Sequence, residues 1–186
     1  APQLNAKSAT EFMLKPHESA AAEFDIVEPD GHFYSIDFEP GSEAAVLDTL
    51  VRESPKIRIN AASSPTGKYA ARLIITDYYG LSASATVKYE ILENHKPEIV
   101  GTLENMVFSS KGSGTTQIDA SAYFTDADGE ELKYSFSFSN PNVVNMTYGR
   151  GKFLITPMNY GISEITVTGT DVRGESVSQS FKILVA

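Results

Sequence analysis

The sequence predicts an all-β protein made of two consecutive β-sandwich domains. Three observations lead to this fold class: an internal repeat between the two halves, short β-favouring runs divided by turn residues, and a polar, proline-containing stretch at the midpoint. A chain of 186 residues is long enough for two domains of about 90 residues, each of which buries a modest core without help from disulfides.

The internal repeat becomes visible when the sequence is shifted by 94 residues. The segment 67–89 then overlays 161–183 without a gap, and the segment 28–36 resembles 126–136 at a different shift. A change of shift within each unit is expected, because loops tolerate insertions better than strands do. The identical pairs are Gly67/Gly161, Thr76/Thr170, Asp77/Asp171, Gly80/Gly174, Ser82/Ser176, Ser84/Ser178 and Lys88/Lys182.

The repeated segment predicts a hairpin that closes each unit. A β-favouring run leads into an Asp-x-x-Gly turn, and an alternating run follows the turn. The Asp accepts local backbone hydrogen bonds, and the Gly takes the left-handed conformation. The hairpins comprise the runs 71–76 and 165–170, the turns 77–80 and 171–174, and the runs 83–91 and 177–185.

The remaining strands are expected between turn residues at roughly 8–12-residue spacing, which is typical of sandwiches. The segment 42–52 is ambiguous, because its apolar residues have partial helical spacing; it predicts either a short helix or a strand and loop. The other expected strands lie near 11–15, 22–27, 32–38, 43–47, 56–61, 98–101, 105–109, 115–119, 132–138, 143–147 and 152–156.

The polar stretch 93–97 predicts the domain boundary. Pro97 cannot donate a hydrogen bond to a sheet ladder, so a strand is not expected to run through it. We therefore expect an immunoglobulin-like domain over residues 1–95 and a second one over 96–186. Because the chain begins with Ala1 and stops directly after an apolar run, we expect it to be part of a longer protein.

Composition narrows the range of partners. The net charge of −9 disfavours nucleic acid and anionic membrane surfaces, and no apolar run approaches the roughly 20 residues of a membrane span. The sequence has no cysteine, so it has neither disulfides nor thiolate nucleophiles. It also lacks a Gly-x-Ser-x-Gly elbow, a phosphate-binding glycine loop and paired zinc ligands, and we do not expect an enzyme.

The second half carries the motifs of a known family. It resembles the dystroglycan-type cadherin-like module, a member of the immunoglobulin-like domains found in bacterial surface and secreted proteins. The first half resembles it only through 28–36 and 67–91. The resemblance implies an accessory role beside proteases or glycan-active enzymes, and a secreted or cell-surface location. The motifs in the second half are 118–124, 125–129, 132–135, 139–143, 154–157, Gly161 and 170–171.

The same resemblance implies a calcium site between successive domains. Asp126 and Asp128 occupy the family's Asp-x-Asp position, Asp171 its later aspartate, and Glu18 the glutamate of the preceding domain. The linker departs from the family's pattern, because residues 91–95 lack its aspartates. The alternative is a turn in which Gly129 closes a local Asp hydrogen bond. No other cofactor is expected.

Two further groups of residues are candidates for contacts. Tyr78 and Tyr79 stand at the tip of the first hairpin, where they could stack on a sugar or anchor a protein; the alternative is that one ring folds back on the core. The stretch 30–32 (Asp-Gly-His) could bind a metal weakly, whereas a solvated turn is the more common interpretation.

These observations predict a non-catalytic spacer and interaction module of a larger bacterial secreted or cell-surface protein. Its expected partners are the neighbouring domains of that protein. The alternative is an adhesion module that binds a surface glycan or a protein through loops at one end, stiffened by calcium.

Overall fold

Strands make up nearly all of the regular structure, as the alternating runs predict. The computed structural model describes residues 1–186 and divides into unit 1, Ala1–Asn94, and unit 2, His95–Ala186. The only helices are two three-residue 3₁₀ turns, η1 (Ala61–Ser63) and η2 (Ala120–Ala122). Neither helix has the length and apolar character needed to cross a membrane.

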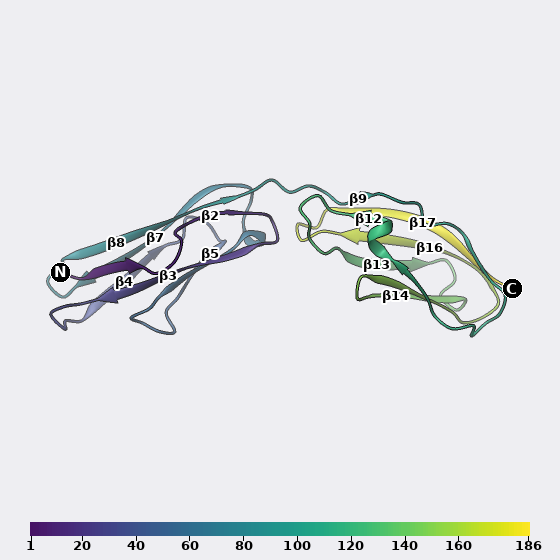
Figure 1. Ribbon diagram of the computed structural model, residues 1–186, viewed down its shortest axis with the longest axis horizontal. Helices are drawn as coiled ribbons and strands as arrows, with labels where there is room; N and C mark the ends of the chain where they lie inside the picture. Colours follow the sequence, from purple (N-terminus) through teal and green to yellow (C-terminus); the bar gives the residue numbers. More distant parts are fainter. The chain divides into compact units, whose positions relative to one another are not determined.

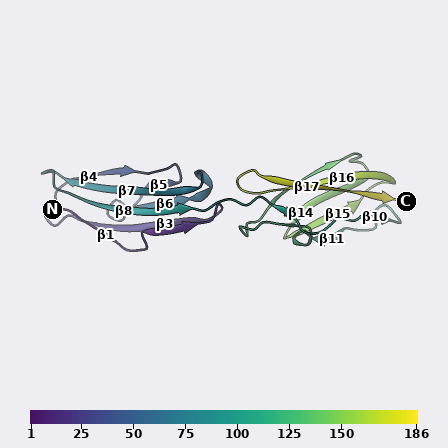
Figure 2. The same cartoon turned by 90° about the horizontal axis from the view of Figure 1, so that it is seen from above.

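Unit 1 is a sandwich of two four-stranded sheets, with strand orders β1-β3-β6-β5 and β2-β8-β7-β4 (Figures 1 and 2). The first strand of the fold is split between the sheets: β1 pairs antiparallel with β3, whereas β2 pairs parallel with β8. The strands are β1 (Gln3–Ala6), β2 (Glu11–Leu14), β3 (Ser19–Val27), β4 (Tyr34–Glu39), β5 (Ala45–Asp48), β6 (Lys56–Asn60), β7 (Gly67–Asp77) and β8 (Ser82–Ile91).

Unit 2 repeats this arrangement. One sheet has the order β10-β17-β16-β13, with β10 parallel to β17, and the opposite layer consists of β11-β15-β14 and the short pair β12-β9. The strands are β9 (Glu98–Ile99), β10 (Met106–Phe108), β11 (Thr116–Asp119), β12 (Phe124–Thr125), β13 (Lys133–Phe138), β14 (Val144–Gly149), β15 (Lys152–Pro157), β16 (Gly161–Thr170) and β17 (Ser176–Val185).

The strand orders confirm the immunoglobulin-like fold in both units. In unit 1 the two sheets correspond to strands A-B-E-D and A′-G-F-C of an immunoglobulin sandwich, and unit 2 has the same order with its first sheet in two pieces. The predicted hairpins are β7–β8 and β16–β17, which pair antiparallel over ten residue pairs each. They form the G and F strands in the sheet of each sandwich that also contains C.

Each sandwich has a core of its own. In β7 and β16 alternate residues point inward, as the period of two predicts: Leu73 and Ile75 in unit 1 and Ile165 and Val167 in unit 2 are completely buried. Phe153 lies at the centre of unit 2, in contact with four other aromatic rings. No buried residue is shared between the two clusters, so each unit stabilises its own sheets.

The segment 42–52 resolves in favour of a strand. Residues 45–48 form β5, which pairs with β6, and the helical alternative is wrong. The reason is tertiary: Ala44 and Ala45 are buried at the sandwich edge, where the pairing with β6 satisfies the backbone and outweighs a weak helical pattern. The sequence also gave no signal for β1, whose residues do not alternate in burial.

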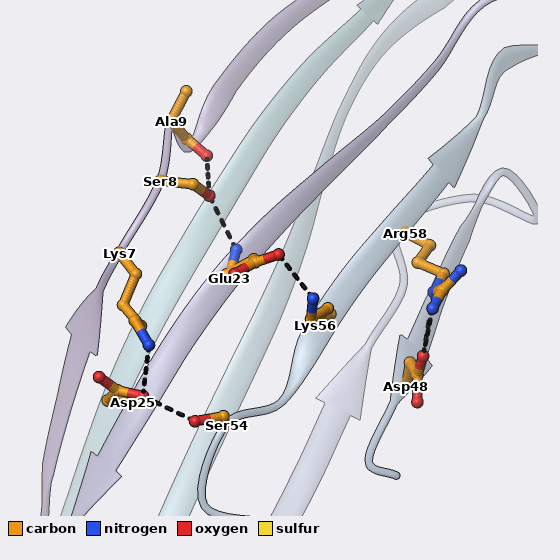
Figure 3. A network of polar contacts seen from close by, with 9 residues as sticks. All are labelled: Lys7, Ser8, Ala9, Glu23, Asp25, Asp48, Ser54, Lys56 and Arg58. Carbon is orange, nitrogen blue, oxygen red and sulfur yellow. Dashed lines mark hydrogen bonds and ion pairs between the residues drawn. The ribbon is translucent and has the colours of Figure 1, made fainter. Parts of the chain in front are cut away.

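Ion pairs and hydrogen bonds connect neighbouring strands on the outer face of the first sheet of unit 1 (Figure 3). Lys56 Nζ lies 2.6 Å from Glu23 Oε1, directly opposite it in the register of β3 and β6, and Lys7 Nζ lies 3.4 Å from Asp25 Oδ1. The hydrogen bond from Lys56 lowers the pKa of Glu23, and the hydrogen bond from the Ser54 hydroxyl lowers that of Asp25. The observed register of β3 and β6 is favoured because it places the opposite charges of Glu23 and Lys56 next to each other.

Candidate metal centre in the second unit

The loop after β12 folds around Asp126. Its Oδ1 accepts a hydrogen bond from Asp128 N at 2.8 Å, and its carbonyl accepts one from Gly129 N at 3.1 Å. Gly129 takes the left-handed conformation, with φ 77°, that such a turn requires. This is the Asp turn expected from the sequence as the alternative to calcium binding. The turn uses Oδ1 of Asp126 as a hydrogen-bond acceptor and does not involve its Oδ2.

A second loop brings Asp171 to the same place. Lys133 at the start of β13 lies opposite Thr170 at the end of β16, so the loop before β13 and the loop after β16 are neighbours. Asp171 Oδ1 accepts hydrogen bonds from Arg173 N and Glu175 N, both at 2.8 Å. The side chain is buried at the base of this turn, as the Asp-x-x-Gly pattern predicts.

Three carboxylates converge between these loops. Asp126, Glu130 and Asp171 each offer an oxygen, and the three oxygens lie within 4.8 Å of one another. Glu130 is held in place because its Oε1 accepts a hydrogen bond from Val172 N at 2.8 Å. Asp126 and Glu130 also line a shallow hollow of about 270 Å³, which leaves space for water beside the carboxylates.

Asp126 is the most informative member of this cluster. The residue is only 8% exposed, and its Oδ2 is buried without a hydrogen-bond partner. Burial raises the pKa of its carboxyl group, and the charges of Asp128 and Asp171 raise it further, against the opposing effects of the Asp128 N–H and of His95. A buried acceptor without a donor is costly, and a bound cation would remove that cost.

The donor set suits a hard cation. Calcium takes six to eight oxygen ligands, often from several carboxylates, and here all three candidate groups are carboxylates. The cluster would supply part of that shell, and water in the adjoining hollow would supply more. The residues present therefore fit calcium chemically.

Asp128 has a different role from its neighbour. Its Oδ2 accepts a hydrogen bond from His95 N at 2.8 Å, and its Oδ1 lies 2.9 Å from His95 Nδ1. Asp128 is buried, whereas the His95 side chain is 61% exposed. Asp128 thus fixes the first residue of unit 2 to the loop that carries Asp126, and it is not among the three converging carboxylates.

Glu18 lies in unit 1, in the turn between β2 and β3. Its Oε2 accepts a hydrogen bond from Lys15 N at 2.8 Å, and its own N–H donates to the Lys15 carbonyl at 3.0 Å. This reciprocal pair gives Glu18 a clear local role in closing the turn. Its participation in a calcium site stays a prediction.

Tyr78 and Tyr79 project from the β7–β8 turn. Their rings are 78% and 69% exposed, so neither folds back on the core. They meet edge to face at 5.4 Å, and Tyr79 also contacts the ring of His32 edge to face at 4.9 Å. The pair therefore offers an exposed aromatic surface at this end of unit 1.

Glu130 is the member of the cluster that the sequence reasoning missed. The resemblance points to Asp126, Asp128 and Asp171, and the set of ligands that it implies does not include Glu130. The available signal was the run of acidic residues on both sides of Gly129, because a loop that turns at that glycine brings them together.

The fold and the repeat define this protein as a tandem pair of immunoglobulin-like β-sandwich domains. No protein-family model and no curated protein matches the sequence. Among solved structures it is similar to an endo-fucoidan hydrolase of glycoside hydrolase family 107, with 14% identity and a TM-score of 0.47 over 95% of this chain and 28% of that one.

Two further solved structures give similar matches. An I-band fragment of titin shows 13% identity and a TM-score of 0.39 over 99% of this chain and 65% of that one. The extracellular domain of protocadherin GammaB4 shows 14% identity and a TM-score of 0.41 over 100% and 33%. The chain thus spans less than two thirds of each of these three structures.

Proposed function

We propose that this chain is a non-catalytic spacer and interaction module of a larger bacterial secreted or cell-surface protein, where it connects or presents neighbouring domains. The observation that carries the proposal is the pair of separate cores, one in each sandwich. A spacer needs units that stay folded without help from their neighbours, and a sandwich with a closed core meets this need.

The test compares three versions of the parent protein: the natural one, one without residues 1–186, and one with an unrelated pair of sandwich domains in their place. A spacer role predicts that deletion impairs secretion, surface localisation or activity, and that the replacement restores it. Unchanged behaviour after deletion would refute the proposal. Loss that the replacement fails to restore would assign the role to a specific surface of this chain.

A binding role is the second candidate, and the exposed tyrosine pair favours it. Aromatic rings that protrude from a turn stack on sugars or fill pockets in a protein partner. Glycan-array and cell-surface binding of the full chain, compared with a Tyr78→Ala/Tyr79→Ala variant, tests this role. The proposal predicts binding that the double variant loses, and equal signals from both proteins would exclude these rings as the contact.

A calcium ion bound at the carboxylate cluster would stiffen unit 2. The buried Oδ2 of Asp126, which has no hydrogen-bond partner, favours such an ion. Ligands that bind only the folded state raise the melting temperature by mass action. We expect the melting temperature of the full chain to rise with Ca²⁺ and to fall with chelator, and Asp126→Ala to abolish the response. An unaltered calcium response in that variant would place the ion elsewhere.

A further inference from the structure

The loop between β3 and β4 of unit 1 repeats the geometry of the Asp126 turn. Glu28 Oε1 accepts a hydrogen bond from Asp30 N at 3.2 Å, and the Glu28 carbonyl accepts one from Gly31 N, also at 3.2 Å. Gly31 is left-handed, with φ 68°. These are the same three features that shape the loop around Asp126, so the repeat extends to the loops that carry the charged groups.

The two loops differ in the chemistry of their last donor. Unit 2 has Glu130 two residues after Asp128, whereas unit 1 has His32 two residues after Asp30. The substitution changes the chemistry of the loop from carboxylates alone to two carboxylates and an imidazole. Imidazole nitrogen is a poor ligand for calcium and a good one for zinc and its neighbours in the first transition row.

The three side chains of the unit 1 loop converge. One ligand atom each from Glu28, Asp30 and His32 lies within 4.8 Å of the other two. Independently of this convergence, Glu28 Oε2 and His32 Nδ1 are both shielded from solvent and have no hydrogen-bond partner. Two buried polar atoms without partners, of the two types that zinc accepts, indicate a ligand between them.

The surroundings fix one ligand and leave another accessible. The His32 ring packs edge to face against Tyr79 at 4.9 Å, which restricts its rotation. The side chain of Asp30 is 58% exposed. A metal ion could therefore enter from the Asp30 side and retain a water molecule as a further ligand.

We propose that Glu28, Asp30 and His32 form a binding site in unit 1 for a divalent transition-metal ion, with Zn²⁺ the preferred ion. The site goes beyond the proposed spacer function and is independent of the calcium cluster in unit 2. The equivalent loops thus contribute to two different sites. One suits a hard cation, where Glu130 joins Asp126 and Asp171, and the other suits a borderline ion, where His32 joins Glu28 and Asp30.

The test is a Zn²⁺ titration of the full chain by calorimetry, with Co²⁺ absorption as a probe of nitrogen ligation. An Asp126→Asn background removes the unit 2 cluster, so the two sites succeed or fail separately. We expect one Zn²⁺ per chain, weakened more than about tenfold by His32→Ala or Glu28→Gln, because even outer-shell changes at metal sites cost 10–100-fold. Asp37→Asn, on the adjoining exposed face of β4, is the charge-matched control.

The His32→Glu variant gives a second, constructive test. It makes all three donors carboxylates, as they are in the unit 2 cluster, and we expect it to lose Zn²⁺ preference and to gain Ca²⁺ affinity. Metal-free melting of each variant verifies that it is folded. Absence of Zn²⁺ binding by the unmodified chain would overturn the proposal. Equal Zn²⁺ affinity in His32→Ala, Glu28→Gln and Asp37→Asn would also overturn it, because the ion would then be bound by His17, His95 or scattered carboxylates.

Discussion

The surroundings of Asp126 disfavour the charged form of its carboxyl group. Its folded-state pKa is raised by burial and by neighbouring carboxylates, so the folded protein binds this proton more tightly than the unfolded chain does. The charged group therefore opposes folding at any pH above its folded-state pKa. The penalty disappears as the pH falls through that value towards the unfolded one of about 3.9.

Asp126→Asn is expected to act in opposite directions with and without metal. In chelator at pH 7 the variant should be at least as stable as the parent chain, because it lacks the charge penalty. The difference should shrink as the pH falls below the folded-state pKa of Asp126. In millimolar Ca²⁺ the parent chain should be the more stable. Urea unfolding from pH 4 to 8 in both solutions measures this, and a variant that is less stable in chelator at pH 7 would contradict the account.

The sequence could predict the local parts of this site and not the non-local ones. Asp126 and Asp171 were predicted as ligands because the family resemblance implies ligands at their positions, and each also lies in a turn motif that a few adjacent residues define. The approach of Asp171 to Asp126 and Glu130 depends on the pairing of β13 with β16, which joins residues far apart in the chain. The contact between Asp128 and His95 likewise joins residues 33 positions apart. No local pattern carries this information.

At the scale of the elements, Gly41 lies in the connection between β4 and β5, where this connection passes close to β7. Its φ is 73°, and a Cβ at this position would collide with the backbone carbonyl of Ala70 in β7. Gly80, in the β7–β8 turn, has φ 84° with open space around it. We expect Gly80→Ala to cost about 1–2 kcal/mol for the left-handed conformation alone, and Gly41→Ala to cost more.

Urea unfolding of the two alanine variants measures this difference. Gly80→Ala is the matched control, because it imposes the same backbone conformation without the steric conflict. Equal losses of unfolding free energy would show that Gly41 is required only for its conformation and that the approach to Ala70 is relaxed in solution.

Most strands could be predicted because their apolar and polar residues alternate. The strands that were not predicted lack this alternation or are too short to show it. β8 and β17 alternate over ten residues each, and both were anticipated. β1 and β12 hold four and two residues, and their place in the sheets depends on partners elsewhere in the chain. The segment 42–52 was ambiguous because weak helical spacing competes there with an edge-strand position that only the folded sandwich supplies.

At the scale of the whole molecule, the account predicts that damage to one core stays in its unit. Phe153 is completely buried in unit 2 among Phe124, Tyr134, Phe136 and Tyr148. Phe153→Ala should cost unit 2 about 3–5 kcal/mol, since the cavity cannot close fully around the lost ring.

Amide hydrogen exchange of the full chain, resolved by residue, checks this expectation. Protection should fall throughout unit 2 and stay unchanged in unit 1, and Ile162→Ala, at an exposed position on β16, should change neither unit by more than about 0.5 kcal/mol. An equal loss of protection in both units would mean that they unfold as one.

The most direct measurement is the NMR spectrum of each unit expressed alone, residues 1–94 and 95–186, compared with that of the whole chain. Two sandwiches with separate cores predict that each fragment gives a dispersed amide spectrum whose strand and core signals coincide with those of the whole chain, with shifts only near residues 94 and 95. A fragment that is unfolded, or whose core signals differ throughout, would contradict the claim that this chain folds as two self-sufficient modules.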